Sequence, residues 1–198
     1  MPRRTAAAVL LVFGVLFAAA TQPAAAQDAR TFIGTLGTQA IQVLGPTVPE
    51  SQRIARFREL FRNDFDMAAI SRFVLGRYWR TATPQEQQEF MSLFQEYLVR
   101  AYSARLGQYG GEPFRVTGAR PAGEQTIVSS QILRLNGGAP IEVDWYLAGG
   151  PAGYKITDVY VGGVSMAVTQ RDEFASVIQR SGGVAGLLAQ LRQKLAAS

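Results

Sequence analysis

The periodicity of apolar residues changes once along this chain, after Gly107, and this change constrains the class of fold. Before it, apolar residues recur every three or four positions, which is typical of amphipathic helices. After it come short β-rich runs separated by Gly, Pro and Asn, at residues 112–119, 125–135, 141–148 and 154–161. Helical spacing returns after residue 169. This order predicts an α+β fold, with helices packed on one face of a twisted, four-stranded antiparallel sheet.

The longest predicted helix begins at Thr83 and ends at Gly107. Thr83 and Glu86 have the spacing of a capping box, Pro84 suits the first helical position, and glycine is common where helices end. At ~1.5 Å per residue the helix is roughly 35 Å long. Its stripe of aromatic and aliphatic residues predicts that one face packs against the sheet.

Alternation along the third β-rich run predicts which face of the sheet is buried. Val143 and Trp145 lie on one face, and Asp144 lies on the other. The first face is expected to meet the helices and the second to meet water. In the second run Val128 and Ile132 share a face, but the pattern does not show whether that face points inward.

The N-terminus has the features of a secretory signal peptide. Arg3 and Arg4 precede an apolar run at 6–20, and small residues follow at 24–26. This pattern predicts a signal peptide over 1–26, cleaved after Ala26. An uncleaved membrane anchor is the alternative, but the run is short for a span.

The rest of the chain, 27–198, is predicted to form a single domain, since it is long enough for one core and contains no linker or repeat. Its predicted parts are N-terminal helices over 29–107, a sheet over 112–161, and C-terminal helices over 169–195 that begin with Thr169 as the cap.

The composition excludes several kinds of site. The chain has no histidine and no cysteine, so Ser-His-Asp and Cys-His sites, His-bearing zinc sites and disulfides are ruled out. We therefore expect no metal and no cofactor. Carboxylate catalysis stays open, and an isomerase or hydratase that uses Asp144 or Asp158 is an alternative function. Loss of Arg3 and Arg4 lowers the net charge from +5 to +3, and no basic block suggests nucleic acid.

Several motifs together resemble the periplasmic phospholipid shuttles of the MlaC and toluene-tolerance type. These motifs are LGRYWR at 75–80 followed by ATP at 82–84, YKITDV at 154–159, GVS at 163–165, and Arg171 with FAS at 174–176. Hopanoid-associated periplasmic proteins are similar over the same span. Two positions depart from the family pattern: Tyr154 stands where Trp is frequent, and Gly162 where an acidic residue is frequent.

The resemblance implies a periplasmic, monomeric lipid carrier with a cone-shaped, NTF2-like α+β fold. In this family an apolar cavity holds phospholipid tails while the head group stays outside. The carrier docks on an outer-membrane lipoprotein complex and on an inner-membrane ABC transporter with its substrate-binding ring, and so maintains the lipid asymmetry of the outer membrane. A hopanoid or another apolar lipid is the alternative cargo.

The cavity is expected between the long helix and the sheet, with a volume in the upper part of the usual ~300–1,000 Å³ range or beyond it. A binding or assembly protein with a filled core would lack such a space. The predicted lining residues on the helices are Val74, Tyr78, Phe94, Tyr97, Leu98 and Tyr102. On the sheet and at its exit they are Val128, Ile132, Val143, Trp145, Val164 and Met166. For each of them, ordinary core packing is the alternative role.

Overall fold

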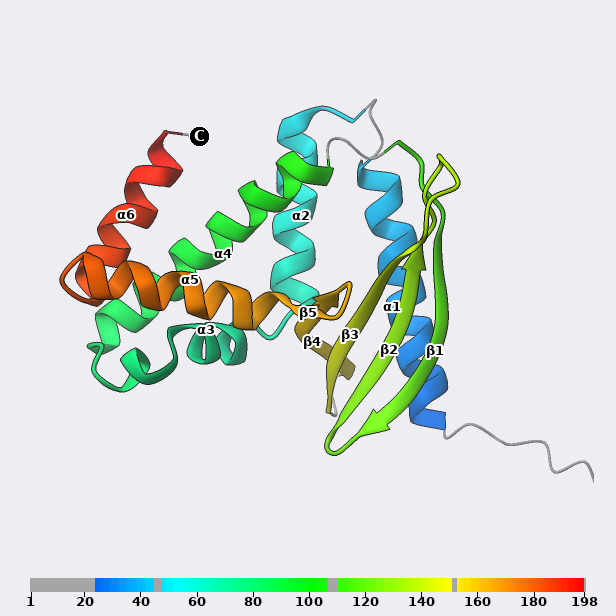
Figure 1. The fold of residues 1–198 in the computed structure, drawn as a ribbon, viewed down its shortest axis with the longest axis horizontal. Helices are drawn as coiled ribbons and strands as arrows, with labels where there is room; N and C mark the ends of the chain where they lie inside the picture. The colour runs from blue at the N-terminus through cyan, green and yellow to red at the C-terminus, as the bar shows by residue number, and fades with distance from the viewer. Residues whose placement is uncertain (1–23, 45–47, 107–109, 151–152, 198) are drawn as a thin grey trace, which may run out of the picture.

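The computed structural model describes residues 24–44, 48–106, 110–150 and 153–197 (Figure 1). The hydrophobic part of the predicted signal peptide, and Gly107 at the predicted end of the long helix, lie outside the described residues. In chain order the elements are α1 (Ala24–Leu44), α2 (Glu50–Asp64), α3 (Met67–Leu75), the 3-10 helix η1 (Gly76–Arg80), α4 (Pro84–Leu106), β1 (Phe114–Ala122), β2 (Gln125–Ile132), β3 (Ile141–Gly150), β4 (Gly153–Val161), β5 (Val164–Ser165), α5 (Met166–Arg180) and α6 (Val184–Ala196). No helix within these ranges is both long enough and apolar enough to cross a membrane.

The strands form one open antiparallel sheet in the order β1-β2-β3-β4-β5, so each strand pairs with its neighbour in sequence. The α+β class and the four-stranded meander are confirmed, and the two-residue β5 adds a short fifth strand that was not predicted. The register pairs Val128 with Trp145 and Ile132 with Ile141, so Val128 and Ile132 share the helix-facing side of the sheet with Trp145. This register settles the orientation that the sequence left open.

The helix starts are set by local capping. Thr83 and Glu86 form the predicted capping box, in which the Glu86 amide donates to Thr83 Oγ1 (3.2 Å) and the Thr83 amide donates to Glu86 Oε2 (2.8 Å). The predicted cap at Thr169 is wrong, because α5 begins at Met166 and Ser165 Oγ accepts from the amide of Val168 (3.0 Å). Ser165 ends β5 with extended backbone, which is the conformation that an N-cap needs.

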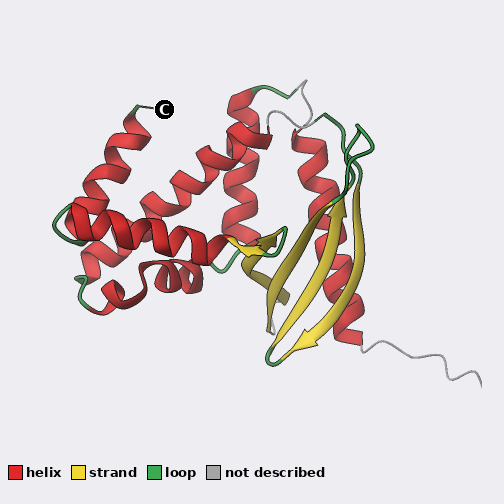
Figure 2. Cartoon of the chain, viewed as in Figure 1, coloured by secondary structure: helices red, strands yellow, loops and turns green. Residues whose placement is uncertain are grey.

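The molecule contains two separate hydrophobic cores. Helices α2 to α6 contribute to the first, in which the rings of Phe90, Phe94 and Phe174 lie with centroids 5.4 to 5.9 Å apart. The second lies between α1 and the sheet, where Ile33 and Leu147 are fully buried. Figures 1 and 2 show this division, with α3 to α6 at one end, the sheet and α1 at the other, and α2 between them.

Phe65 joins the two parts of the molecule. It follows α2, forms an isolated parallel bridge with Ile156 of β4, and packs against both cores. The next amide, of Asp66, donates to the carbonyl of Ile156 (2.9 Å). Asp66 then caps α3 as predicted, since its Oδ1 accepts from the amide of Ala69 (2.9 Å).

Candidate functional site

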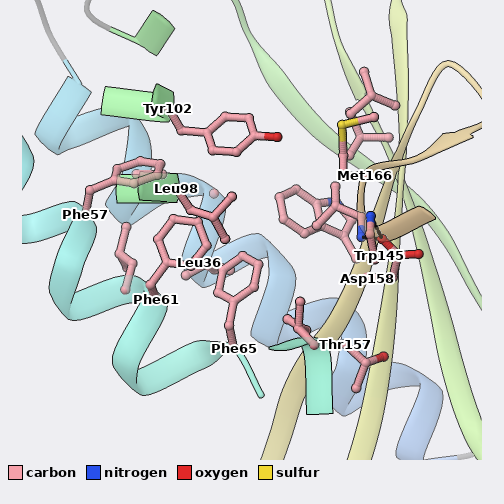
Figure 3. A pocket seen from close by; sticks show the side chains of 18 of the residues that line it. Leu36, Phe57, Phe61, Phe65, Leu98, Tyr102, Trp145, Thr157, Asp158 and Met166 are labelled. Atoms are coloured by element: carbon pink, nitrogen blue, oxygen red, sulfur yellow. Dashed lines mark hydrogen bonds between the residues drawn. The ribbon is translucent and has the colours of Figure 1, made fainter. Parts of the chain in front are cut away.

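A cavity of about 330 Å³ lies between the two cores. Its walls come from α1, α2, α3, α4, the sheet and the start of α5. Figure 3 shows Phe57, Phe61 and Phe65 on one side of the space, and Trp145 and Met166 on the other.

The α2 wall is aromatic because of the spacing of its phenylalanines. Phe57, Phe61 and the C-cap residue Phe65 follow one another at intervals of four residues, so their side chains lie on the same side of α2. Their ring centroids are 5.6 Å and 4.5 Å apart in succession, and they form one continuous apolar surface. Arg58 fixes this wall to α4, because its guanidinium donates to both carboxylate oxygens of Glu96 (2.7 and 3.0 Å). The hydrogen bond from Arg58 lowers the pKa of Glu96 below its ordinary value.

The sheet wall follows from the two-residue period of the strands. Ile132, Val143 and Trp145 all point to the side that holds the cavity. The indole Nε1 of Trp145 donates to Ser130 Oγ (2.8 Å), and Ser130 Oγ donates to the carbonyl of Val143 (3.1 Å). Since the polar edge of Trp145 is bonded within the sheet, its apolar ring surface is left to line the cavity.

The α1 wall depends on a close helix-to-strand approach. Leu36, Ala40 and Ile41 of α1 line the cavity, and the ring of Phe114 from β1 lies directly over Gly37. A Cβ atom at Gly37 would stand 2.4 Å from that ring, so any larger residue there would have to displace the ring or the helix.

Four polar side chains border the cavity: Glu112, Thr157, Asp158 and Gln170. Asp158 accepts from Ser165 Oγ (2.5 Å), from the Val159 amide (2.7 Å) and from the Ala167 amide (3.1 Å), so its carboxylate holds the start of α5. Thr157 Oγ1 donates to the carbonyl of Tyr146 (3.1 Å). The space therefore suits an apolar ligand. The described residues contain no cluster of acidic side chains that could hold a metal ion.

Seven of the twelve predicted residues line this cavity: Phe94, Leu98, Tyr102, Ile132, Val143, Trp145 and Met166. The other five lie elsewhere. Val74 and Val128 are fully buried, one in each core. Tyr97 packs on Phe174, with Lys194 Nζ 5.0 Å from its ring centroid.

Tyr78 and Val164 lie near the surface. Tyr78 is half-buried on η1 and accepts a hydrogen bond from Arg77 Nη2 (2.8 Å). Val164 is 54% exposed on β5 and does not line the cavity, although its register partner Val161 does.

The sequence prediction missed the parts of the lining that come from α1, α2, α3, β1 and β4. The inward stripe of α2 was visible in the sequence, but a stripe does not show which element it faces. The close approach at Gly37 carried a signal too, since a glycine within a helical pattern often marks such a contact.

The observed volume also differs from the prediction. It lies at the low end of the usual ~300–1,000 Å³ range rather than in the upper part. The rings of Phe57, Phe61 and Phe65 on one side and of Trp145 on the other narrow the space between the helices and the sheet.

Residues 38–193 match the family model described as MlaC protein. The chain is similar to the toluene tolerance protein ttg2D of Pseudomonas putida, with 29% identity over 139 residues, which cover 65% of this chain and 64% of that protein. It is also similar to the intermembrane phospholipid transport system binding protein MlaC of Haemophilus influenzae, with 22% identity over 144 residues, which cover 69% of this chain and 67% of that protein. The chain thus spans about two thirds of the length of these curated relatives.

One solved structure matches the fold over most of its length. It is the phospholipid-binding protein of Ralstonia solanacearum in complex with a phospholipid. The TM-score is 0.73 and the sequence identity is 25%, and the match covers 86% of this chain and 98% of the other.

Proposed function

This chain belongs to the MlaC protein family, and from that premise we propose that it is a lipid carrier whose cavity holds the acyl chains of a phospholipid. The observation that carries the proposal is the apolar cavity between the two cores. The Ralstonia protein, which has the same fold, is in complex with a phospholipid, and this likeness supports the choice of ligand.

The carrier is proposed to work in the periplasm after cleavage of the N-terminal signal. It exchanges lipid with an outer-membrane lipoprotein complex and with an inner-membrane ABC transporter, and so contributes to outer-membrane lipid asymmetry. The names of the two curated relatives, which refer to intermembrane phospholipid transport and to toluene tolerance, support this role.

Burial of the lipid tails determines how the carrier can release its cargo. Each CH₂ group removed from water contributes ~0.8 kcal/mol, so two acyl chains amount to roughly 20 kcal/mol before opposing terms. Release into water is therefore slow. Transfer to a bilayer or to an apolar channel in a docked partner costs little, because the tails stay in an apolar medium. Docking is thus the step that controls exchange.

The cavity is proposed to widen when two tails enter, since about 330 Å³ is small for them. The α1 wall is suited to such movement. In the part of the chain that the structure describes, the side-chain hydrogen bonds of α1 run from Thr31 and Thr38 to the carbonyls of Gln27 and Gly34 in the same helix. Apolar packing on β1, β2 and α2 therefore holds α1, and such contacts can slide without breaking directional bonds.

The enzymatic alternative has less support, because both candidate carboxylates have structural partners. Asp144 lies on the opposite face of the sheet from the cavity, where it accepts from Ser129 Oγ (2.6 Å). Asp158 accepts three hydrogen bonds that hold α5. We therefore propose a carrier without catalytic activity.

The test is native mass spectrometry of the mature protein purified from its exported compartment, followed by lipid extraction. A co-purified diacyl phospholipid that transfers to acceptor vesicles would support the proposal. A hopanoid in its place would keep the carrier but change the cargo. Absence of lipid, together with no uptake from phospholipid vesicles, would contradict the carrier function.

A further inference from the structure

The segment from α3 through η1 is basic and lies outside the function proposed above. Residues 67–81 contain Arg72, Arg77 and Arg80 and contain no Asp or Glu. All three arginines are exposed.

Two of the three arginines of this segment lie over aromatic rings. The guanidinium carbon of Arg72 lies 5.6 Å from the ring centroid of Trp79, and that of Arg77 lies 4.9 Å from Tyr78. Arg171 of α5 completes the group, 4.8 Å from the ring of Phe73. The hydrogen bond from Arg77 also lowers the pKa of the Tyr78 hydroxyl.

We name this surface the arginine–aromatic face and define it by the following residues: Arg72, Phe73, Arg77, Tyr78, Trp79, Arg80 and Arg171. Phe73 is 42% exposed and adds apolar surface to this face.

The positive charges of this face are mostly uncompensated. Among the ion pairs of the described residues, none involves Arg72, Arg77 or Arg80. The neighbouring carboxylates Asp66 and Glu86 accept backbone amide hydrogens at the starts of α3 and α4. An arginine that stacks on a ring still has its N–H edge available for an anion.

We propose that the arginine–aromatic face docks on the anionic surface of a membrane, through the phosphate groups of lipid heads. The planar guanidinium matches phosphate with paired hydrogen bonds. Half-buried Trp and Tyr side chains suit the head-group layer, where one end of the ring is apolar and the other is wet. The absence of acidic residues from 67–81 removes the repulsion that an anionic surface would otherwise meet.

Docking through the arginine–aromatic face would bring the lipid cavity close to the membrane surface. Ile70 on the inner side of α3 lines the cavity, while Arg72 and Phe73 are exposed on the outer side of the same helix. One helix, roughly 10 Å across, therefore separates the docking surface from the lipid site. This proposal does not depend on which ligand the cavity holds.

The test measures binding of the mature protein to phosphatidylcholine vesicles with and without phosphatidylglycerol, by co-sedimentation at low salt. Binding is expected only with the anionic lipid, and it should weaken as salt is raised. The variant Arg72→Gln, Arg77→Gln, Arg80→Gln should lose about five-fold for each arginine, on the order of 100-fold in total, from ~1 kcal/mol per basic residue near an anionic surface.

A matched control distinguishes an effect of this face from an effect of the protein's total charge. Arg56→Gln, Arg115→Gln, Arg134→Gln removes the same charge from exposed positions on α2, β1 and the β2–β3 loop, and it should bind almost as the unmodified protein does. A second measurement uses Trp79, which is one of two tryptophans in the chain. With Trp145→Phe as background, lipids brominated near the head group should quench Trp79 emission.

The binding of the two triple variants and the quenching of Trp79 distinguish docking on an anionic membrane from the alternatives. Loss in the first triple variant with retention in the control, together with quenching of Trp79, supports it. Equal loss in both triple variants, or binding that does not depend on anionic lipid, overturns it. Arginine-dependent binding to an acidic protein surface with no binding to vesicles also overturns it.

Discussion

Gly37 of α1 and Phe114 of β1 are in such close contact that a methyl group on Gly37 would stand 2.4 Å from the phenylalanine ring. Both residues line the cavity, so this contact sets how closely α1 approaches the sheet and where the ring lies. The size of the lipid site is thus linked to the absence of one side chain.

Gly37→Ala is therefore expected to destabilise the protein by about 1–3 kcal/mol, because the added methyl group must displace the ring or the helix. The displaced ring has the cavity on one side, so lipid capacity should fall as well. Denaturant unfolding and native mass spectrometry of the purified variant measure the two effects.

Gly34→Ala is the matched control, three residues earlier on the same helix. Its Cβ would lie 4.0 Å from Val116, an ordinary contact. This variant is expected to keep its lipid and to gain roughly 0.5–1 kcal/mol, because alanine favours a helix over glycine. Equal behaviour of the two variants would show that the Phe114 contact does not limit the site.

Val161 and Val164 offer a second matched pair, at the two ends of the β4–β5 turn. Val161 lines the cavity and is 38% exposed, whereas Val164 is 54% exposed and lies outside the lining. Val161→Glu should lower lipid occupancy, because a carboxylate beside the tails must be desolvated or must displace them. Val164→Glu should leave occupancy nearly unchanged. Occupancy is read by phospholipid content per protein, and the reverse order would mean that lipid enters on the β5 side.

The Arg58–Glu96 contact predicts a dependence of stability on pH. Arg58 lowers the pKa of Glu96 in the folded state, so the unfolded state binds this proton more readily. The contribution of ionised Glu96 to the free energy of unfolding is complete above the ordinary glutamate pKa of 4.5. It is lost as the pH falls through the lower pKa that Glu96 has in the folded state. Glu96→Gln is expected to lower the free energy of unfolding by about 0.5–1 kcal/mol at pH 7, and by much less once the carboxyl is protonated.

Comparison of the two proteins at each pH isolates this effect. Burial raises the pKa of Asp64, so this residue changes the pH dependence of stability in the opposite direction. Its effect cancels in the comparison, because the unmodified protein and the Glu96→Gln variant both contain Asp64. Glu59→Gln is the control on α2. This variant removes the ion pair of Glu59 with Arg56, whose charged atoms are 3.5 Å apart. Both side chains are more than half exposed, so little change in the free energy of unfolding is expected. A difference that stays constant from pH 7 to acid would contradict the assignment.

Asp158→Ala tests the structural role of that carboxylate. It leaves the Ser165 hydroxyl and the amides of Val159 and Ala167 without their acceptor, so a loss of about 1–3 kcal/mol is expected. Thermal unfolding followed by circular dichroism measures it. A variant with native stability that loses a substrate-converting activity would instead favour the enzymatic alternative.

Features that depend on local sequence could be predicted for this chain. The alternation around Val143 and Trp145 gave the buried face of the sheet, because side chains on a strand change sides at every residue. The Thr83–Glu86 capping box was confirmed, because its bonds span only one helical turn. The start of α5 was misplaced, because Ser165 became a cap only through the short strand that precedes it.

Features that depend on tertiary contacts could not be predicted. Phe94 and Tyr97 belong to one stripe of α4, yet Phe94 reaches the cavity and Tyr97 packs on Phe174 of α5. A stripe wide enough to meet two neighbours does not show which neighbour each residue touches. For the same reason the sequence did not assign the phenylalanines of α2 to the cavity.

The division of the apolar interior into two cores has a consequence for how the empty and loaded forms compare. Each core is closed by its own helices or strands, and Phe65 is a shared contact between them. A lipid bound along this seam would contact both cores at once. It would therefore stabilise their association beyond what the polypeptide's own contacts provide. The delipidated protein should then melt at a lower temperature than the loaded one, with the earliest loss of amide-exchange protection along the seam rather than at the centre of either core.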